Sequence, residues 1–118
     1  TNLGTGLTES SGIFSFPSTG YYYIAFSFII YADAGESNHD IRLIFTTDNS
    51  NYNNVYSVNG NVLSADPLTL GGSFILDITD TTNCKFALDY YASAATNNIL
   101  GHATECKSGF RCFRLADT

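Results

Sequence analysis

Residues 12–31 read GIFSFPSTGYYYIAFSFIIY, and this stretch decides the fold. Its residues are mostly β-branched or aromatic, and glycine and proline bound the runs, which indicates strands and turns. We predict a short strand over residues 12–16, a turn over residues 17–20 and a long strand over residues 21–31. The turn opens on a proline, which cannot donate a ladder hydrogen bond, and closes on a glycine, which tolerates a positive φ.

Alternation divides the long strand into two faces. The first face, which we expect to be core, carries Tyr22, Ile24, Phe26, Phe28 and Ile30. The second face, called the tyrosine face below, carries Tyr21, Tyr23, Ala25, Ser27, Ile29 and Tyr31. Its tyrosines could belong to the core, to a subunit interface or to a sugar-stacking platform. We favour an interface, because tyrosine combines a large contact area with a polar tip.

Composition limits the classes of function. The chain has 118 residues, enough for one domain (residues 1–118), and 44% of them are hydrophobic, which is enough for a packed core. It carries only five lysines and arginines and a net charge of −6. Such a chain is a poor partner for nucleic acid or anionic lipid, because phosphate binding needs many cations. No apolar run reaches the roughly 18 residues of a membrane span, so we expect no membrane insertion.

Two further features concern the ends of the chain and its thiols. The sequence contains no methionine and begins with Thr1, so we expect it to be a fragment that lacks upstream residues. Three cysteines, an odd number, do not form a disulfide framework. Buried free thiols are the simpler reading, although one bridge from Cys106 to Cys112 or to Cys84 stays open. No Cys-x-x-Cys pair supports zinc.

The rest of the chain has the same strand-and-turn pattern. Turn-forming stretches over residues 32–40, 49–54, 65–72 and 92–109 are expected to be loops, and residues 1–11 a lead-in loop. Asn59-Gly60 predicts a two-residue hairpin turn. The strands expected beyond the central one are residues 41–48, 55–58, 62–63, 73–79, 84–91 and 110–115, with a weak one near 98–103. Short strands at this spacing predict an all-β, two-sheet antiparallel sandwich.

The order Gly-x-Phe-x-Phe-Pro-x-x-Gly-x-Tyr, then a Gly-Gly strand, then a Ser-Gly-Phe strand resembles the globular heads of the complement and tumour-necrosis-factor-like family. The matching pieces are residues 12–23, 71–91 and 108–115. The resemblance implies a jelly roll that assembles as a homotrimer around aromatic-rich strands. It would then place Tyr21, Tyr23, Ile29 and Tyr31 in the trimer interface.

A closer resemblance is to jelly-roll proteins of marine bacteriophages. It rests on GTGLTESSGIFSFPSTGYY, on TTDNSNY and on the ending Phe-x-Arg-Leu-x-Asp-Thr. It implies a non-enzymatic structural protein of the virion that decorates the capsid or forms a tail-fibre head. Its partners would be itself, other virion proteins and a glycan or protein of the host surface.

The family has an additional first strand, often carrying tryptophan, that pairs beside the last strand. This chain contains no tryptophan, so that strand would lie upstream of Thr1 or come from another chain. The alternative function is a secreted, extracellular complement-like head that binds a carbohydrate or protein ligand.

Candidate catalytic residues are few. His39 beside Asp40 and His102 near Glu105 could each form an acid–base pair. No partnered nucleophile motif accompanies them, so we read both as solvated loop histidines and expect no enzyme.

Loop residues supply the remaining candidates. Complement-like heads sometimes hold calcium, and five carboxylates fall in predicted loops: Asp33, Glu36, Asp40, Asp48 and Asp66. Their spacing matches no dedicated calcium loop, so we expect no cofactor and keep calcium as the alternative. If a ligand is bound, Tyr52, Tyr56 and Tyr91 are the expected loop contacts, against the simpler reading of surface packing. Arg111 and Arg114 lie on opposite faces of the last strand, where either could pair with a carboxylate of another subunit, such as Asp77 or Asp89.

Overall fold

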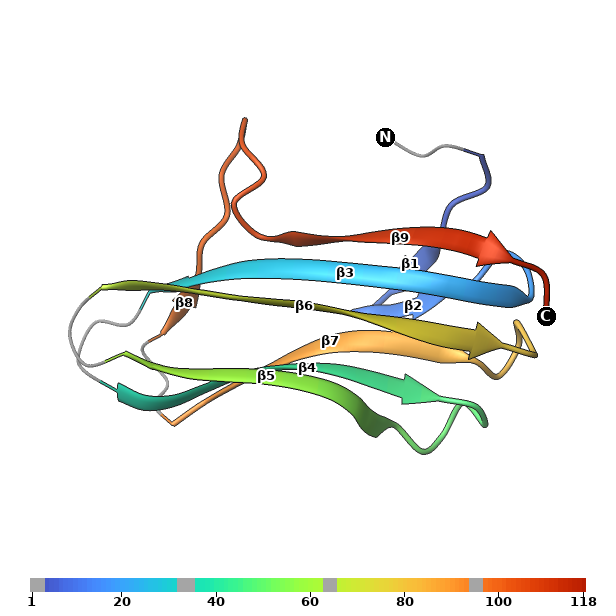
Figure 1. Cartoon of the computed structure of the whole chain (residues 1–118), viewed down its shortest axis with the longest axis horizontal. Helices are drawn as coiled ribbons and strands as arrows, with labels where there is room; N and C mark the ends of the chain where they lie inside the picture. The colour runs from blue at the N-terminus through green and yellow to red at the C-terminus, as the bar shows by residue number, and fades with distance from the viewer. Residues whose placement is uncertain (1–3, 32–35, 63–65, 94–96) are drawn as a thin grey trace.

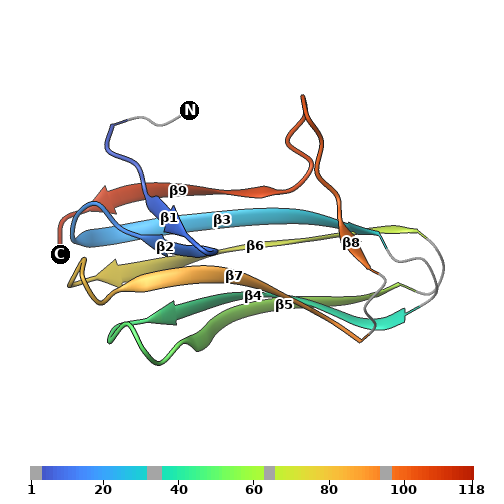
Figure 2. The ribbon, with the colours of Figure 1, turned by 180° about the vertical axis from the view of Figure 1, so that it is seen from behind.

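The computed structural model describes residues 4–31, 36–62, 66–93 and 97–118. Within these ranges the chain is all-β and forms two antiparallel sheets packed face to face (Figures 1 and 2). The first sheet has the order β1-β2-β7-β4-β5, and in the second β6 pairs with β3, whose other edge carries β8 and β9. The strands are β1 (Thr8–Ser10), β2 (Ile13–Ser15), β3 (Gly20–Tyr31), β4 (Glu36–Thr46), β5 (Asn53–Val62), β6 (Pro67–Ile78), β7 (Lys85–Ala92), β8 (Asn98–Ile99) and β9 (Gly109–Ala116).

The chain passes repeatedly between the two sheets. From β2 to β9 it changes sheet at every connection except β4–β5 and β8–β9. The two antiparallel sheets confirm the predicted two-sheet antiparallel sandwich. The described part of the chain contains no helix long and apolar enough to cross a membrane.

The core lies between the sheets and is built largely from aromatic rings. Phe86 of β7 stacks on Phe14 of β2 at 5.0 Å between ring centroids and meets Phe110 of β9 edge-on at 5.7 Å. The rings of Phe16 and Tyr22 lie 4.7 Å apart at the end of the same cluster. As predicted, the core face of β3 is inward: four of its five residues are buried and the fifth, Phe28, packs against the core.

Two predicted breaks are in fact strand interior. Residues 59–60 lie within β5 and do not form a hairpin turn, and most of the predicted loop over 65–72 belongs to β6. Their glycines mark close packing instead of turns. A Cβ on Gly60 would approach the Leu68 side chain to 3.1 Å, and a Cβ on Gly72 would lie 2.4 Å from the Tyr56 ring.

Gly71 offers a test of this packing. A Cβ there would lie 2.8 Å from the backbone oxygen of Phe26, which cannot rotate away. We expect Gly71→Ala to lower the free energy of unfolding by about 1–3 kcal/mol, because overpacking forces the backbone to shift. Ser73→Ala, two residues along on the same outward side, should change it by less than about 0.5 kcal/mol. Urea unfolding of both variants checks this, and equal stabilities would contradict it.

Two other assignments were also wrong. Residues 8–10, expected in a lead-in loop, form β1, which pairs with β2 from Thr8↔Ser15 to Ser10↔Ile13. Residues 36–40, also expected in a loop, begin β4, while residues 32–35 lie outside the described residues. At the other end of β4, Thr46 is 1% exposed and its hydroxyl donates to Asp48 Oδ1 at 2.9 Å.

Candidate functional site

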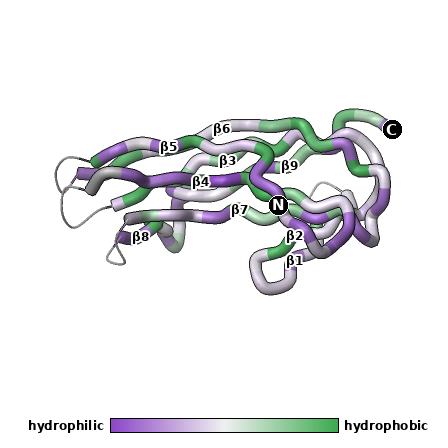
Figure 3. The backbone as a smooth tube through the Cα atoms, turned by 90° about the horizontal axis from the view of Figure 1, so that it is seen from below, coloured by the Kyte–Doolittle hydropathy of each residue, from purple (hydrophilic) through white to green (hydrophobic). Residues whose placement is uncertain are grey.

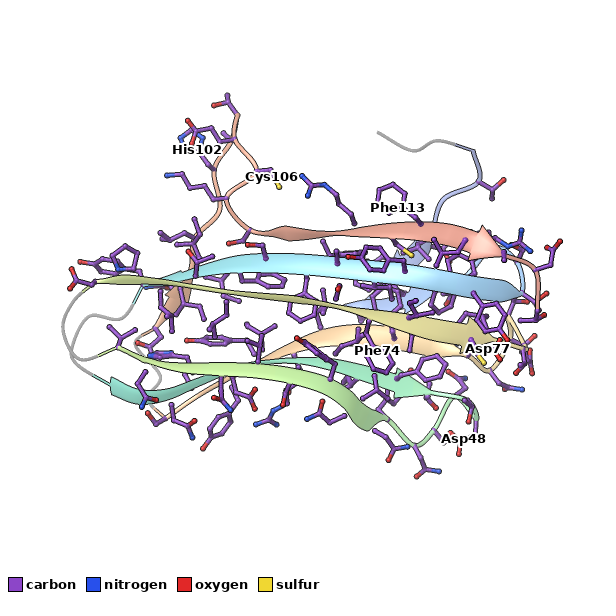
Figure 4. All side chains as sticks on the ribbon, in the orientation of Figure 1. Asp48, Phe74, Asp77, His102, Cys106 and Phe113 are labelled. Atoms are coloured by element: carbon purple, nitrogen blue, oxygen red, sulfur yellow. The ribbon has the colours of Figure 1, made fainter. Side chains whose placement is uncertain are left out.

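The outer surface of the sheet formed by β6, β3 and β9 is the candidate site, and strand register builds it. Tyr23 at the middle of β3 lies between Ile75 on β6 and Phe113 on β9. Ile75 is 53% exposed and Phe113 is 50% exposed, so an apolar row crosses the sheet on the side away from the core. Figure 4 shows Phe113 projecting away from the other sheet, whereas Phe74 lies between the sheets.

The tyrosine face predicted from alternation is the central strip of this surface. Tyr21 and Tyr31, at its two ends, are 40% and 36% exposed, and Tyr23 and Ile29 are half-buried. The described part of the chain therefore leaves these side chains partly open to solvent. Their role in a trimer interface stays a prediction. Figure 3 colours the residues of β6, β3 and β9, those of both faces together, by hydropathy and shows hydrophobic stretches along these strands.

Sequence reasoning missed Ile75 and Phe113 as members of this surface. The signal was present, because alternation in residues 73–79 places Ile75 opposite to the inward Phe74 and Leu76. Register across three strands was needed to show that Ile75, Tyr23 and Phe113 form one row.

A pocket lies on the same surface, under the loop that leads into β9. Its volume is about 330 Å³. Figure 1 shows this loop rising from the end of β8 above β9, away from the sandwich. Two hydrogen bonds attach it to β3: Ile29 N–H donates to Ser108 Oγ at 3.0 Å, and Leu100 N–H donates to Ile29 O at 2.8 Å. The pocket is lined by Ala25, Phe26, Ser27, Cys106, Lys107, Gly109, Phe110 and Arg111.

The three cysteines are all free, in line with the simpler sequence reading. Cys84 is buried, Cys112 is half-buried and Cys106 is exposed, so the expectation of buried thiols holds in full for Cys84 alone. Burial raises the pKa of the Cys112 thiol to about 11, so this group is a weak nucleophile at neutral pH.

The two histidines differ. His102 is exposed in the loop before β9, as predicted. The prediction of a solvated loop is wrong for His39, which lies in β4 and is 0% exposed. Its Nδ1 shares a hydrogen bond of 2.9 Å with the Tyr90 hydroxyl, and the two rings stack at 6.3 Å. Asp40 binds Arg42 at 2.7 Å instead, so the predicted His39–Asp40 pair is not seen.

The tyrosines proposed as loop contacts lie apart from one another. Tyr52 is half-buried in the loop between β4 and β5. The loop placement is wrong for Tyr56, which lies in β5 with its ring near Phe26 and against Gly72. It is also wrong for Tyr91, which is exposed on β7 with the Arg42 guanidinium 5.0 Å from its ring centre. The fold therefore does not bring these three residues into one surface.

The candidate calcium ligands are only partly described. Among the described residues no group of three or more His, Cys, Asp and Glu side chains is arranged to hold a metal ion, and Asp33 lies outside them. Asp48 uses its carboxylate within its own turn, where Oδ1 accepts from the N–H groups of Ser50 and Asn51 and from the Thr46 hydroxyl. Asn51 Nδ2 donates to the other oxygen at 2.6 Å.

These turn hydrogen bonds predict a dependence of stability on pH. The donors from Asn51, Ser50 and Thr46 hold the pKa of Asp48 below its usual 3.8, and those from Thr82 and Asn83 lower the pKa of Asp80. A depressed pKa means that the stabilisation is complete above about pH 4 and is lost as the pH falls further. The melting temperature should therefore drop between about pH 5 and about pH 3.

The matched variant replaces both carboxylates, as Asp48→Asn with Asp80→Asn. Its melting temperature should lie below that of the wild type at neutral pH. The further fall in melting temperature on acidification should be smaller, because the variant no longer has these two carboxylates to protonate. Thermal unfolding of both proteins, followed by circular dichroism at neutral pH and at about pH 3, measures these two effects. Parallel curves for the two proteins would show that these turns do not cause the acid sensitivity.

The arginines of β9 lie as alternation predicted. Arg111 pairs in register with Ala25 and lines the pocket, whereas Arg114 pairs with Tyr22. Arg114 donates to Thr19 O at 2.9 Å and forms an ion pair with Asp117. Asp77 is exposed at the end of β6, opposite Tyr21, and makes no ion pair with any described residue (Figure 4).

Comparison with known proteins returned no match to a family model and no significant match to a curated protein.

Proposed function

We propose that this chain is a non-enzymatic structural protein of a bacteriophage virion, a homotrimeric jelly roll that decorates the capsid or forms a fibre head. The observation that carries the assembly part is the apolar row Phe113–Tyr23–Ile75 on the outer surface of the β6-β3-β9 sheet. Large apolar groups that cross a whole sheet on its solvent side are typical of surfaces that another chain covers. The virion role is supported by the resemblance of the sequence to phage jelly-roll proteins.

The connectivity supports a jelly roll within the sandwich. A chain that changes sheet at nearly every connection from β2 to β9 has the alternation of two interleaved Greek keys. The jelly-roll family that the sequence resembles also has a strand that pairs beside the last one. Within the described residues β9 pairs only with β3, so its second edge is open to such a strand. Unpaired edges invite pairing, which supports a strand supplied from elsewhere in the assembly.

A closed ring of three copies is the proposed assembly. The row lies on one side of the molecule only, so copies that meet through it around a threefold axis bury it and leave the other sheet outside. The loop before β9 rises on the same side of the molecule as this row (Figures 1 and 4), so in the proposed ring it lies beside the interface.

Antibody labelling tests the virion role. Antibodies raised against the folded domain should decorate purified phage particles at regular positions on the head or on the fibre tips. Labelling of secreted material with none on particles would favour the alternative, a complement-like recognition head. Absence from both would overturn the structural role.

A further inference from the structure

The pocket beneath the loop before β9 has an unusual charge for this protein. The whole chain has five lysines and arginines and a net charge of −6, yet two of the five cationic side chains, Lys107 and Arg111, line this one pocket. Neither makes an ion pair with any described residue. Arg42 and Arg114, in contrast, are both paired with aspartates.

The neighbouring carboxylates do not neutralise this pair. Glu105 precedes Cys106 in the loop, but it is exposed and does not line the pocket. Asp77, on β6, lies two strands and about four residues along the sheet from Arg111, a separation of roughly 16 Å between Cα atoms. An ion pair needs its nitrogen and oxygen within about 4 Å, so Asp77 is too far from Arg111, and Arg111 has no acidic partner among the described residues.

The remaining walls leave room for a ligand. Three of the lining residues have a small side chain or none: Ala25, Ser27 and Gly109. Gly109 packs closely on Cys106, because a Cβ added to this glycine would lie 3.4 Å from the Cys106 sulfur. The volume of about 330 Å³ is at the small end of ligand pockets, which run from about 300 to 1,000 Å³. It therefore suits a ligand of about the size of one sugar ring.

We propose that this pocket binds an oxyanion, a carboxylate or sulfate group carried by a small ligand such as an acidic sugar. The planar guanidinium of Arg111 matches the two oxygens of such a group, and the Lys107 ammonium adds a second charge. The Ser27 hydroxyl and the apolar lining side chains of Ala25, Phe26 and Phe110 would contact the rest of the ligand. This inference goes beyond the assembly proposal and does not require it.

The test uses anions of defined chemistry at constant ionic strength. Sulfate and glucuronate are titrated into ¹⁵N-labelled protein, with glucose as the neutral sugar, and amide shifts are followed by NMR. Saturable shifts are expected at residues 25–27 and 106–111 with both anions and not with glucose. Arg111→Gln and Lys107→Gln should each weaken binding about tenfold, as expected for a lost charge-assisted hydrogen bond. Lys85→Gln, the same change on the other sheet, should leave it unchanged.

Each outcome decides the inference. Circular dichroism of every variant excludes loss of folding as the cause of weaker binding. Shifts that do not saturate, or that saturate at the same anion concentration in Arg111→Gln as in the wild type, would mean adventitious binding and overturn the proposal. Sedimentation of the same samples separates the two proposals, because anion binding by a monomer would support the pocket while refuting the trimer. If the assembled protein binds neither anion, a second copy fills the pocket and the proposal fails.

Discussion

Replacing Phe86 with alanine is expected to lower the free energy of unfolding by about 3–5 kcal/mol, the usual cost of truncating a buried phenylalanine. The ring is 0% exposed and contacts Phe14 and Phe16 on one side and Phe110 of the facing sheet on the other. Its loss opens a cavity at the point where the two sheets meet, and the surrounding strands cannot collapse fully into it.

Urea unfolding of Phe86→Ala measures the loss. Ile99→Ala is the control, because Ile99 is 40% exposed on the short β8 and should cost less than about 1 kcal/mol. Both variants are compared at protein concentrations low enough that any assembly is dissociated. A loss below about 1 kcal/mol for Phe86→Ala would contradict the position of the core.

Replacing Phe113 with aspartate is expected to weaken self-association about 100-fold while leaving the fold intact. Phe113 is half exposed and lies on the apolar row, so the proposed interface would have to bury an unpaired carboxylate. Tyr91→Asp is the matched control, because Tyr91 is similarly exposed but belongs to the other sheet. Sedimentation velocity over a concentration series compares the two variants. Equal association would place the interface elsewhere.

The sequence predicted most of the two sheets because their strands have clear alternation. Residues 21–31 and 84–91 place apolar side chains on one side with few exceptions, and both became strands with those side chains inward. Turn chemistry was equally reliable where a carboxylate organises the turn, as at the start of the predicted turn over residues 49–54, where Asp48 accepts from Asn51 N–H at 2.7 Å.

The failures share a physical cause. Gly60, Gly71 and Gly72 were read as local turn formers, but each is small because a neighbouring strand or ring approaches closely, and local sequence does not encode the identity of that neighbour. His39 was read as solvated because polar residues surround it in the chain, whereas its partner Tyr90 lies 51 residues away.

The candidate site was predictable only in part. Alternation identified the tyrosine face of β3, but the flanking Ile75 and Phe113 join it through strand register. The pocket was not predictable, because Lys107 and Arg111 meet Ala25 and Ser27 only after β9 pairs with β3.

Sedimentation equilibrium of the wild-type domain at neutral pH tests the central claim most directly. The protomer has a mass of 12.8 kDa, and a single species of three times that mass is predicted over a range of micromolar concentrations. A species that remains at the mass of one protomer throughout this range would contradict the proposed assembly through the tyrosine face.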